Sequence, residues 1–94
     1  MSDLPSQQLL DEMHSFPGRF VFKAIGRADN GFESRVVAAV REALAKDVDA
    51  PYEIRTTSGG RHVSVTIEPW VESSVQVMDI FAAIRSVEGL VMLM

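Results

Sequence analysis

Cysteine is absent from this 94-residue chain, and basic residues are fewer than acidic ones. Without cysteine there is no disulfide framework and no thiolate nucleophile. That composition fits a reducing compartment, so we expect a cytoplasmic protein. The 9 Lys and Arg residues against 13 Asp and Glu residues give a formal net charge of −4. Such a surface repels phosphate backbones, and we therefore expect no nucleic-acid partner.

Long apolar runs are also lacking. Every run is far shorter than the roughly 20 residues that a membrane-spanning helix needs, so we expect no membrane partner. The N-terminal segment shows no basic region followed by an apolar one, which is the pattern of a signal peptide. Apolar residues nevertheless make up 47% of the chain. We expect a single domain over residues 1–94 with one hydrophobic core.

The residue patterns that carry catalysis or bind metal are missing. The two histidines, His14 and His62, lie on different predicted elements with no cysteine nearby, which disfavours a metal site. No serine stands in a nucleophile elbow, and no glycine-rich loop matches a phosphate-binding P-loop. We therefore predict no catalytic residues, no bound metal, no cofactor and no enzymatic activity.

The clearest pattern that is present is a β-hairpin over residues 52–67. Residues 52–57 and 62–67 both alternate between apolar and polar side chains, which is typical of strands with one buried face. The linking segment contains Gly59 and Gly60, and glycine readily adopts the positive φ that a tight turn demands.

Two elements are predicted before the hairpin. Leucines at helical spacing predict a short helix over residues 5–14, with Asp3 as a candidate cap. Alternation then predicts a first strand over residues 19–25, which Gly26 ends.

Two longer helices are predicted from an apolar stripe that follows a capping pattern. Asn30 with Glu33 three positions later predicts a helix N-terminus, and the stripe continues to about residue 46. Ser73 with Gln76 predicts a second one, which continues to about residue 86.

The order of these elements predicts an α+β fold. Residues 90–94 are apolar at every position, so this last strand is either covered on both faces or an edge that a partner uses. Two split βαβ units predict a ferredoxin-like βαββαβ sandwich, with a four-stranded antiparallel sheet and both long helices on one face. Right-handed connections place the strands in the order 4-1-3-2, counted along the chain. The expected core consists of Phe20, Phe22, Val36, Val40, Leu44, Val63, Val65, Ile67, Phe81 and Ile84.

The first candidate site is the loop after the first strand. Its candidate ligand-binding residues are Gly26, Arg27, Asp29 and Asn30. This loop leads into a helix N-terminus, where outward-pointing amides attract anions. A tight turn with a helix cap explains the same residues without any ligand. Asp29 also places a negative charge at the mouth of the loop.

The second candidate site is the sheet face that the helices leave open. We expect it to present Lys23, Glu53, Arg55, Thr57, His62, Ser64 and Thr66, with Lys23, Arg55, His62 and Ser64 as the candidate site residues. These side chains form either a solvated face with cross-strand pairs or a platform for a ligand or partner. Aromatic residues on which bases stack are absent from this set, which disfavours RNA recognition.

Several short motifs follow one another along the chain. They are Phe16-Pro17, Phe20-x-Phe22-Lys23-x-x-Gly26 and Ser58-x-Gly60-x-x-x-Ser64-Val65-Thr66-Ile67, followed by a closing helix and an apolar strand. This series resembles the YbeD-like family of uncharacterised bacterial proteins. The resemblance covers about residues 9–94. It implies a fold similar to ACT-type regulatory domains, which sense amino acids and other small ligands near the loop after the first strand. By that likeness Gly26, Asp29 and Asn30 are the ligand-loop residues.

A looser likeness is to acylphosphatases, which share the ferredoxin-like fold. It rests on Gly26-Arg27 followed by Gly31-Phe32, which resembles their phosphate loop. Those enzymes also need an asparagine on a central strand to position water. The only asparagine in this chain is Asn30, which the sequence places in the loop itself.

These patterns predict a non-enzymatic regulatory or adaptor domain that acts through contacts with another protein. One alternative is an ACT-type sensor that binds an amino-acid-like small molecule at the first loop. A further alternative is an acylphosphatase-like hydrolase. A homodimer through the edge at residues 91–94 is also open.

Overall fold

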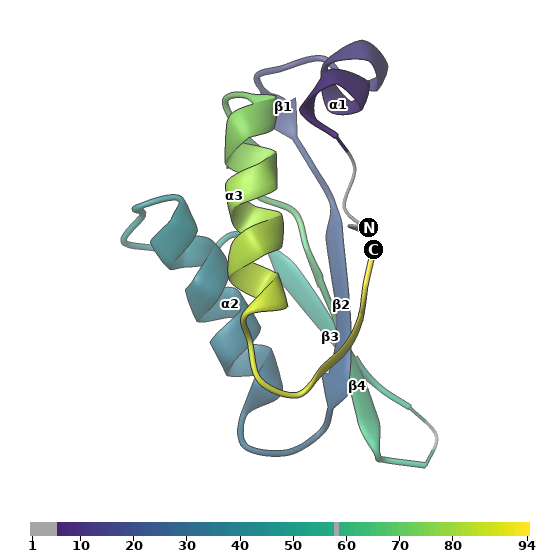
Figure 1. Cartoon of the computed structure of the whole chain (residues 1–94). Coiled ribbons are helices and arrows are strands. Elements are labelled where there is room, and N and C mark those ends of the chain that lie inside the picture. The colour runs from purple at the N-terminus through teal and green to yellow at the C-terminus, as the bar shows by residue number, and fades with distance from the viewer. Residues whose placement is uncertain (1–5, 58) are drawn as a thin grey trace.

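The structure is a computed structural model that describes residues 6–57 and 59–94. Figure 1 shows an α+β arrangement in which two long helices pack beside an antiparallel sheet. In chain order the elements are α1 (Gln7–Met13), β1 (Gly18–Arg19), β2 (Phe22–Arg27), α2 (Phe32–Ala43), β3 (Tyr52–Thr56), β4 (His62–Ile67), β5 (Trp70–Val71), α3 (Ser74–Arg85) and β6 (Leu90–Leu93). Among the described residues, no helix has both the length and the apolar character to cross a membrane.

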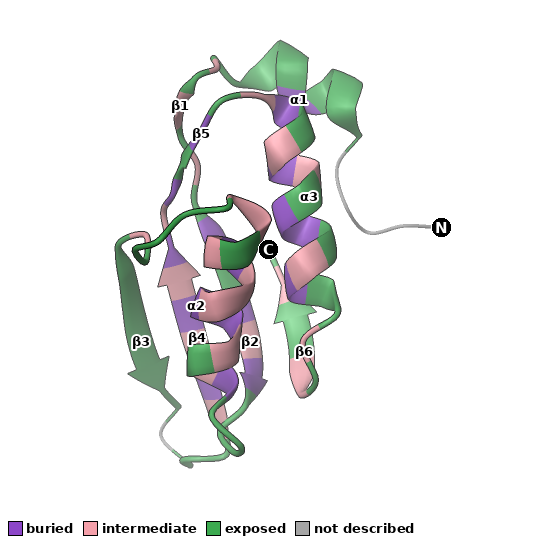
Figure 2. Ribbon diagram, turned by 90° about the vertical axis from the view of Figure 1, so that its left-hand side faces the viewer, coloured by how far each residue is buried: buried purple, intermediate pink, exposed green. Residues whose placement is uncertain are grey.

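Four strands form the main sheet in the order β3-β4-β2-β6, and every neighbouring pair is antiparallel. Helices α2 and α3 lie on one side of it, and no helix of the described residues covers the other side (Figures 1 and 2), which we call the open face. The predicted hairpin is confirmed, because β3 and β4 are antiparallel neighbours. A second, two-stranded sheet of β1 and β5 was not predicted.

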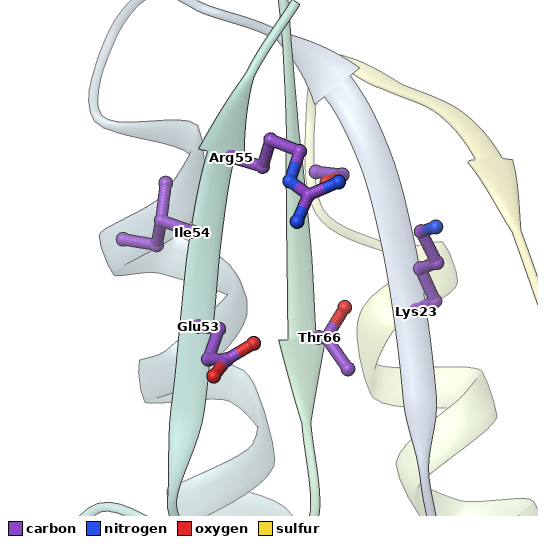
Figure 3. A pocket seen from close by; sticks show the side chains of 6 residues that line it. Lys23, Glu53, Ile54, Arg55 and Thr66 are labelled. Carbon is purple, nitrogen blue, oxygen red and sulfur yellow. The ribbon is translucent and has the colours of Figure 1, made fainter.

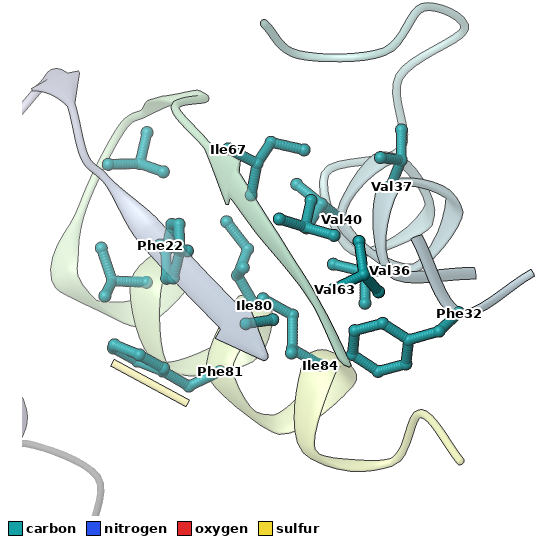
Figure 4. Close-up of a cluster of buried hydrophobic side chains, with 14 of the residues drawn as sticks. Phe22, Phe32, Val36, Val37, Val40, Val63, Ile67, Ile80, Phe81 and Ile84 are labelled. Carbon is teal, nitrogen blue, oxygen red and sulfur yellow. The ribbon is translucent and has the colours of Figure 1, made fainter. Parts of the chain in front are cut away.

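The core lies between the helices and the inner face of the sheet (Figure 4). It forms because alternate residues of β2 and β4 and one stripe of each long helix are apolar. Eight of the expected core residues are buried, whereas Phe20 and Leu44 are partly buried and pack against them. The aromatic rings of Phe20, Phe22 and Phe81 lie with centroids 5.0 to 6.2 Å apart.

The prediction of one strand over residues 19–25 was wrong. The chain forms β1 first, which pairs with β5, and joins the main sheet only from Phe22. Gly26 does not end the strand but lies inside β2. A Cβ atom at Gly26 would come within 2.4 Å of the ring of Phe32, so this strand position passes too close to the helix for any side chain.

The predicted cap of α2 was also wrong. The N-cap residue is Gly31 in the left-handed conformation, with φ 66°, and no side chain caps the helix. Asn30 is left-handed too, with φ 54°. Two such residues turn the chain so that α2 begins at Phe32, whose ring fills the space beside Gly26. The helix ends at Ala43, before the predicted residue 46, and Ala45 is again left-handed.

The N-cap of α3 is the predicted Ser73, whereas α1 is capped by Ser6, which was not predicted. Helix α1 begins at Gln7, and the Ser6 hydroxyl accepts a hydrogen bond from the Leu9 amide at 3.1 Å. Asp3, the expected cap, lies outside the described residues. Ser73 is the N-cap of α3 but makes no side-chain capping bond, and the Gln76 side chain instead accepts from the Glu72 amide at 2.7 Å.

Strand β6 is an edge of the sheet, and it is not covered on both faces. Its pairing with β2 shifts register between Ile25 and Gly26, so that adjacent residues of β2 face Met92 and Leu90. The extra residue is Val91, which is exposed. This bulge allows both Leu90 and Leu93 to pack against the core, although they are three positions apart.

Candidate functional site

Side chains on the open face of the sheet form rows, because residues that face each other on neighbouring strands project from the same side. The first row, from β3 to the end of β6, is Glu53, Thr66, Lys23 and Met94. The second row is Arg55, Ser64, Ile25 and Met92. The third row contains His62 and Arg27. The strands therefore bring all four predicted residues of this face to one surface.

A hollow of about 390 Å³ lies on this face. It is lined by Lys23, Glu53, Ile54, Arg55, Ser64 and Thr66. Figure 3 shows the side chain of Arg55 extending from β3 across β4, on the same side of the sheet as Lys23 and the Thr66 hydroxyl. Ile54 projects away from Arg55, as the alternation of a strand requires.

Three cations of the open face have no ionic partner among the residues that the structure describes. Lys23, Arg27 and Arg55 are all exposed. The one ion pair found within residues 6–57 and 59–94 joins Arg41 to Asp49 at 2.6 Å, away from this face. Glu53 is the single carboxylate that lines the hollow, and it forms no ion pair there. A chain with a net charge of −4 thus presents a locally basic surface.

One half of this face is apolar. Met92 and Met94 are 51% and 54% exposed, and Ile25 between the cations of β2 is half-buried. Sequence reasoning missed these three residues as part of the candidate site. Only the position of β6 beside β2 places the methionines there, and that pairing joins segments far apart in the chain.

The loop after β2 forms a second hollow, of about 300 Å³. It is lined by Arg27, Asp29, Asn30, Arg35, Glu88 and Gly89. Three of the four predicted loop residues therefore lie together. Gly26 is not among the lining residues, and it packs against the ring of Phe32 instead.

Several amides of this loop are already bonded, contrary to the expectation that they point outward to an anion. The Arg27 amide donates to the carbonyl of Gly89 at 3.0 Å, and that of Ala28 donates to Arg61 at 2.9 Å. The Phe32 amide donates to the carbonyl of Asp29 at 3.2 Å. These bonds shape the loop and leave fewer donors for a ligand.

Arg35 on α2, together with Glu88 and Gly89, lines this hollow and was missed by sequence reasoning. Its Nε donates to the carbonyl of Asn30 at 3.0 Å, and a terminal nitrogen donates to that of Glu88 at 2.8 Å. The guanidinium thereby ties the start of α2 to the turn before β6. No local pattern signals this role, because Glu88 is 53 positions away in sequence.

The histidines lie apart in the structure. The ring of His14 packs on Phe20 with centroids 4.9 Å apart, whereas His62 lies on β4 opposite Arg27. Within the part of the chain that the structure describes, no group of three His, Cys, Asp or Glu side chains is placed to hold a metal ion.

Comparisons with known proteins find one matching family, described as "Protein of unknown function (DUF493)", over residues 11–94. The chain is also similar to UPF0250 proteins of Shewanella species. Those of Shewanella piezotolerans and Shewanella halifaxensis are each 37% identical over 79 residues, which span 84% of this chain and 88% of theirs. The protein of Shewanella sediminis is 34% identical over the same shares.

Proposed function

We propose that this chain, which belongs to the DUF493 family of YbeD-like bacterial proteins, is a non-enzymatic regulatory or adaptor domain. It acts through contacts with another protein, and the contact surface is the open face of the main sheet. The observation that carries this proposal is that this one face combines exposed methionines with cations that form no ion pair within residues 6–57 and 59–94.

We infer that the domain, over residues 1–94, is of the ferredoxin-like and ACT-like type. The order β3-β4-β2-β6, with α2 and α3 on one face, supports this inference. It corresponds to the order 4-1-3-2 when the four long strands are counted along the chain. Fold alone does not fix function, so the proposal rests on the surface rather than on the type of fold.

A sheet face that contacts only solvent gains no stability from exposed methionine side chains. Lys23 lies across the Thr66 hydroxyl from Glu53, and Arg55 lies two positions from Glu53 on β3, opposite Ser64. Met92 and Met94 lie at the other side of the same face. Protein interfaces are enriched in methionine and arginine, because both provide large adaptable contacts. This composition therefore favours a protein partner. We place the interaction in the cytoplasm, which the lack of cysteine supports.

Photo-cross-linking in growing bacterial cells tests the proposal. A photoreactive amino acid at Ser64, in the middle of the open face, should yield discrete cross-linked protein species. The matched control is the same amino acid at Glu42, an exposed position on α2. Equal patterns at the two positions, or no product from Ser64, would contradict a role for the open face.

The non-enzymatic part of the proposal has its own test. The purified protein is expected to turn over neither acyl phosphates nor phosphoesters. Turnover that disappears in Arg27→Ala would overturn this expectation and favour the acylphosphatase-like alternative. No contact of the described residues favours that alternative, and Asn30 lies in the loop rather than on a central strand.

A small-ligand sensor is the second candidate, and the hollow beside Arg27, Asp29 and Asn30 is the observation in its favour. This function predicts that amino acids or related metabolites shift the amide NMR signals of residues 26–31. Signals that stay unmoved throughout such a screen would remove it.

A homodimer through β6 stays a prediction. It requires the exposed edge at Val91 and Met92 to pair with a second copy. Sedimentation equilibrium at high protein concentration decides it, and a monomer there would be incompatible with the dimer.

A further inference from the structure

We propose that the open face of the main sheet binds an acidic amphipathic helix of a partner protein. This proposal rests on the proposed function and names the chemistry of its partner. It follows from how charge and apolar area are divided over the face.

The face has a basic part and an apolar part that share a boundary. On β2, Lys23, Ile25 and Arg27 project from the open side in succession. Arg55 adds a cation on the β3 side, two strands from β2. Met92 and Met94 add apolar area on the β6 side, next to Ile25 and Lys23. A partner that covers both parts must itself be amphipathic.

Charge complementarity determines the sign of the charge on the partner's contact surface. None of Lys23, Arg27 and Arg55 has an ionic partner among the described residues. The carboxylates of Glu53 and Glu68 lie together at one end of β4, beside Tyr52, and leave the cations of the middle and far end uncompensated. Opposite charges across an interface steer association and suppress wrong partners. Acidic side chains of the partner therefore meet these three cations.

The dimensions of the face fit a helix. Lys23 and Arg27 are four positions apart on a strand, which is about 13 Å. Two acidic residues seven or eight positions apart on a helix span about 11 to 12 Å. A helix about 10 Å wide that lies along β2 reaches over β4 on one side and β6 on the other, since neighbouring strands are about 4.8 Å apart. Its apolar stripe then contacts Ile25 and the methionines.

Two other occupants fit the face less well. A nucleic acid would match the cations but would leave Met92 and Met94 without contacts, and the three rows contain no Phe, Tyr or Trp ring on which bases could stack. A second copy of this chain would bring its own cations against this face, and like charges across an interface are costly.

The test is a selection of helical peptides on the full chain. The probe is a displayed library of 18-residue helices with a fixed leucine stripe and with Glu, Lys, Ser or Ala varied beside it. We expect enrichment of Glu on the flank next to the stripe. A synthetic peptide of the enriched sequence should shift the amide NMR signals of Lys23, Ser64 and Met92.

Charge reversal identifies the surface. Arg55→Glu should weaken binding of that peptide about tenfold, whereas Lys46→Glu, an equal change of charge on the other side of the molecule, should leave it within twofold. For the apolar part, Met92→Ser should weaken binding, and Val48→Ser, at a position 74% exposed outside this face, should not.

The opposite results overturn the inference. They are enrichment of Lys or of neutral flanks, no enrichment at all, or equal effects of Arg55→Glu and Lys46→Glu. Tighter binding of an oligonucleotide than of the peptide, or self-association that Arg55→Glu abolishes, would assign the face to another occupant.

The two proposals can fail separately. Cross-links from Ser64 without selection of acidic helices would remove only the inference about the partner. Absence of cross-links from Ser64 would remove the proposed function itself.

Discussion

Gly26 is a position where a neighbouring ring decides which residue the chain can accept. The strand passes so close to Phe32 that the missing side chain of Gly26 is the space the ring occupies. Phe32 is fully buried there, so the ring has nowhere to move without opening the core.

Gly26→Ala should therefore destabilise the protein by about 1 to 3 kcal/mol, because the added methyl group overlaps the Phe32 ring. Urea denaturation followed by circular dichroism measures the change. Gly59→Ala is the matched control, since a Cβ at Gly59 meets nothing within 4 Å. Its effect should stay within about 0.5 kcal/mol. Equal losses in the two variants would show that the ring of Phe32 is not the cause.

The sequence could not reveal this role of Gly26. Glycine after an alternating run is usually a strand end, and that rule gave the wrong boundary here. The constraint comes from a ring that is close in space, and a local pattern contains no such information. Asn30 failed for a similar reason. Its type suits a side-chain cap, which is typically formed by an extended residue, but its backbone is left-handed and the N-cap is the next residue, Gly31.

At the scale of elements, α1 is held by few contacts. It has 7 residues, and Leu10, which is 3% exposed, is its one buried residue. A helix this short is not stable alone in water, so its structure depends on docking against α3.

Leu10→Ala should release α1 from the domain. We expect rapid hydrogen exchange of the α1 amides and a loss of about 2 kcal/mol or more if α1 unfolds together with the rest. Leu9→Ala is the control on the same helix, because Leu9 is 46% exposed. Exchange that rises as much in the Leu9 variant would argue against Leu10 as the anchor.

Arg35 connects elements rather than stabilising one of them. Arg35→Ala removes both of its bonds to backbone carbonyls and should cost about 1 kcal/mol. It should also speed hydrogen exchange at the Arg27 amide, which bonds to Gly89 in the same turn. Arg41→Ala is the control, because it breaks only the exposed pair with Asp49. The exchange rate of the Arg27 amide should be unchanged in this variant. Identical exchange in both variants would disprove the connecting role.

Which elements could be predicted depends on how local their signals are. Alternation identified β3 and β4, because each pattern lies within one short segment. The pairing of β1 with β5 was missed, since each strand has two residues and no pattern of its own. Which residues of β6 face the core could not be predicted either, because Val91 and its neighbours are all apolar. Only the bulge determines which of them are exposed.

At the scale of the molecule, one core joins nearly all elements. The cluster contains residues from α1, from both long helices and from strands β2, β4 and β5. A single core of this kind is expected to unfold as a unit.

Thermal and urea unfolding should therefore give coincident curves by far-ultraviolet circular dichroism and by tryptophan fluorescence. Trp70, the one tryptophan, reports from β5, outside the main sheet, and is thus an independent probe. A fluorescence midpoint clearly below that of circular dichroism would show that the β1–β5 sheet melts separately.

The candidate site was predictable in part. Alternation identified Lys23, Arg55, His62 and Ser64 as residues of one open face, because strand neighbours fix which side chains point together. The apolar part at Met92 and Met94 was not predictable, since it depends on which strand lies beside β2. With this apolar part beside the cations, the expected partner is both acidic and apolar.

The bulge at Val91 protects the chain against forming fibrils at high protein concentration. Strand β6 is a short ribbon of apolar residues on an outer margin of the sheet, which is the usual starting point for stacking into fibrils. The irregular pairing twists that margin, so that a strand of another molecule cannot pair with it in a regular ladder. Deleting Val91 would straighten the ribbon, and the shortened chain should seed fibrils, visible as thioflavin fluorescence, under conditions in which the original stays dispersed.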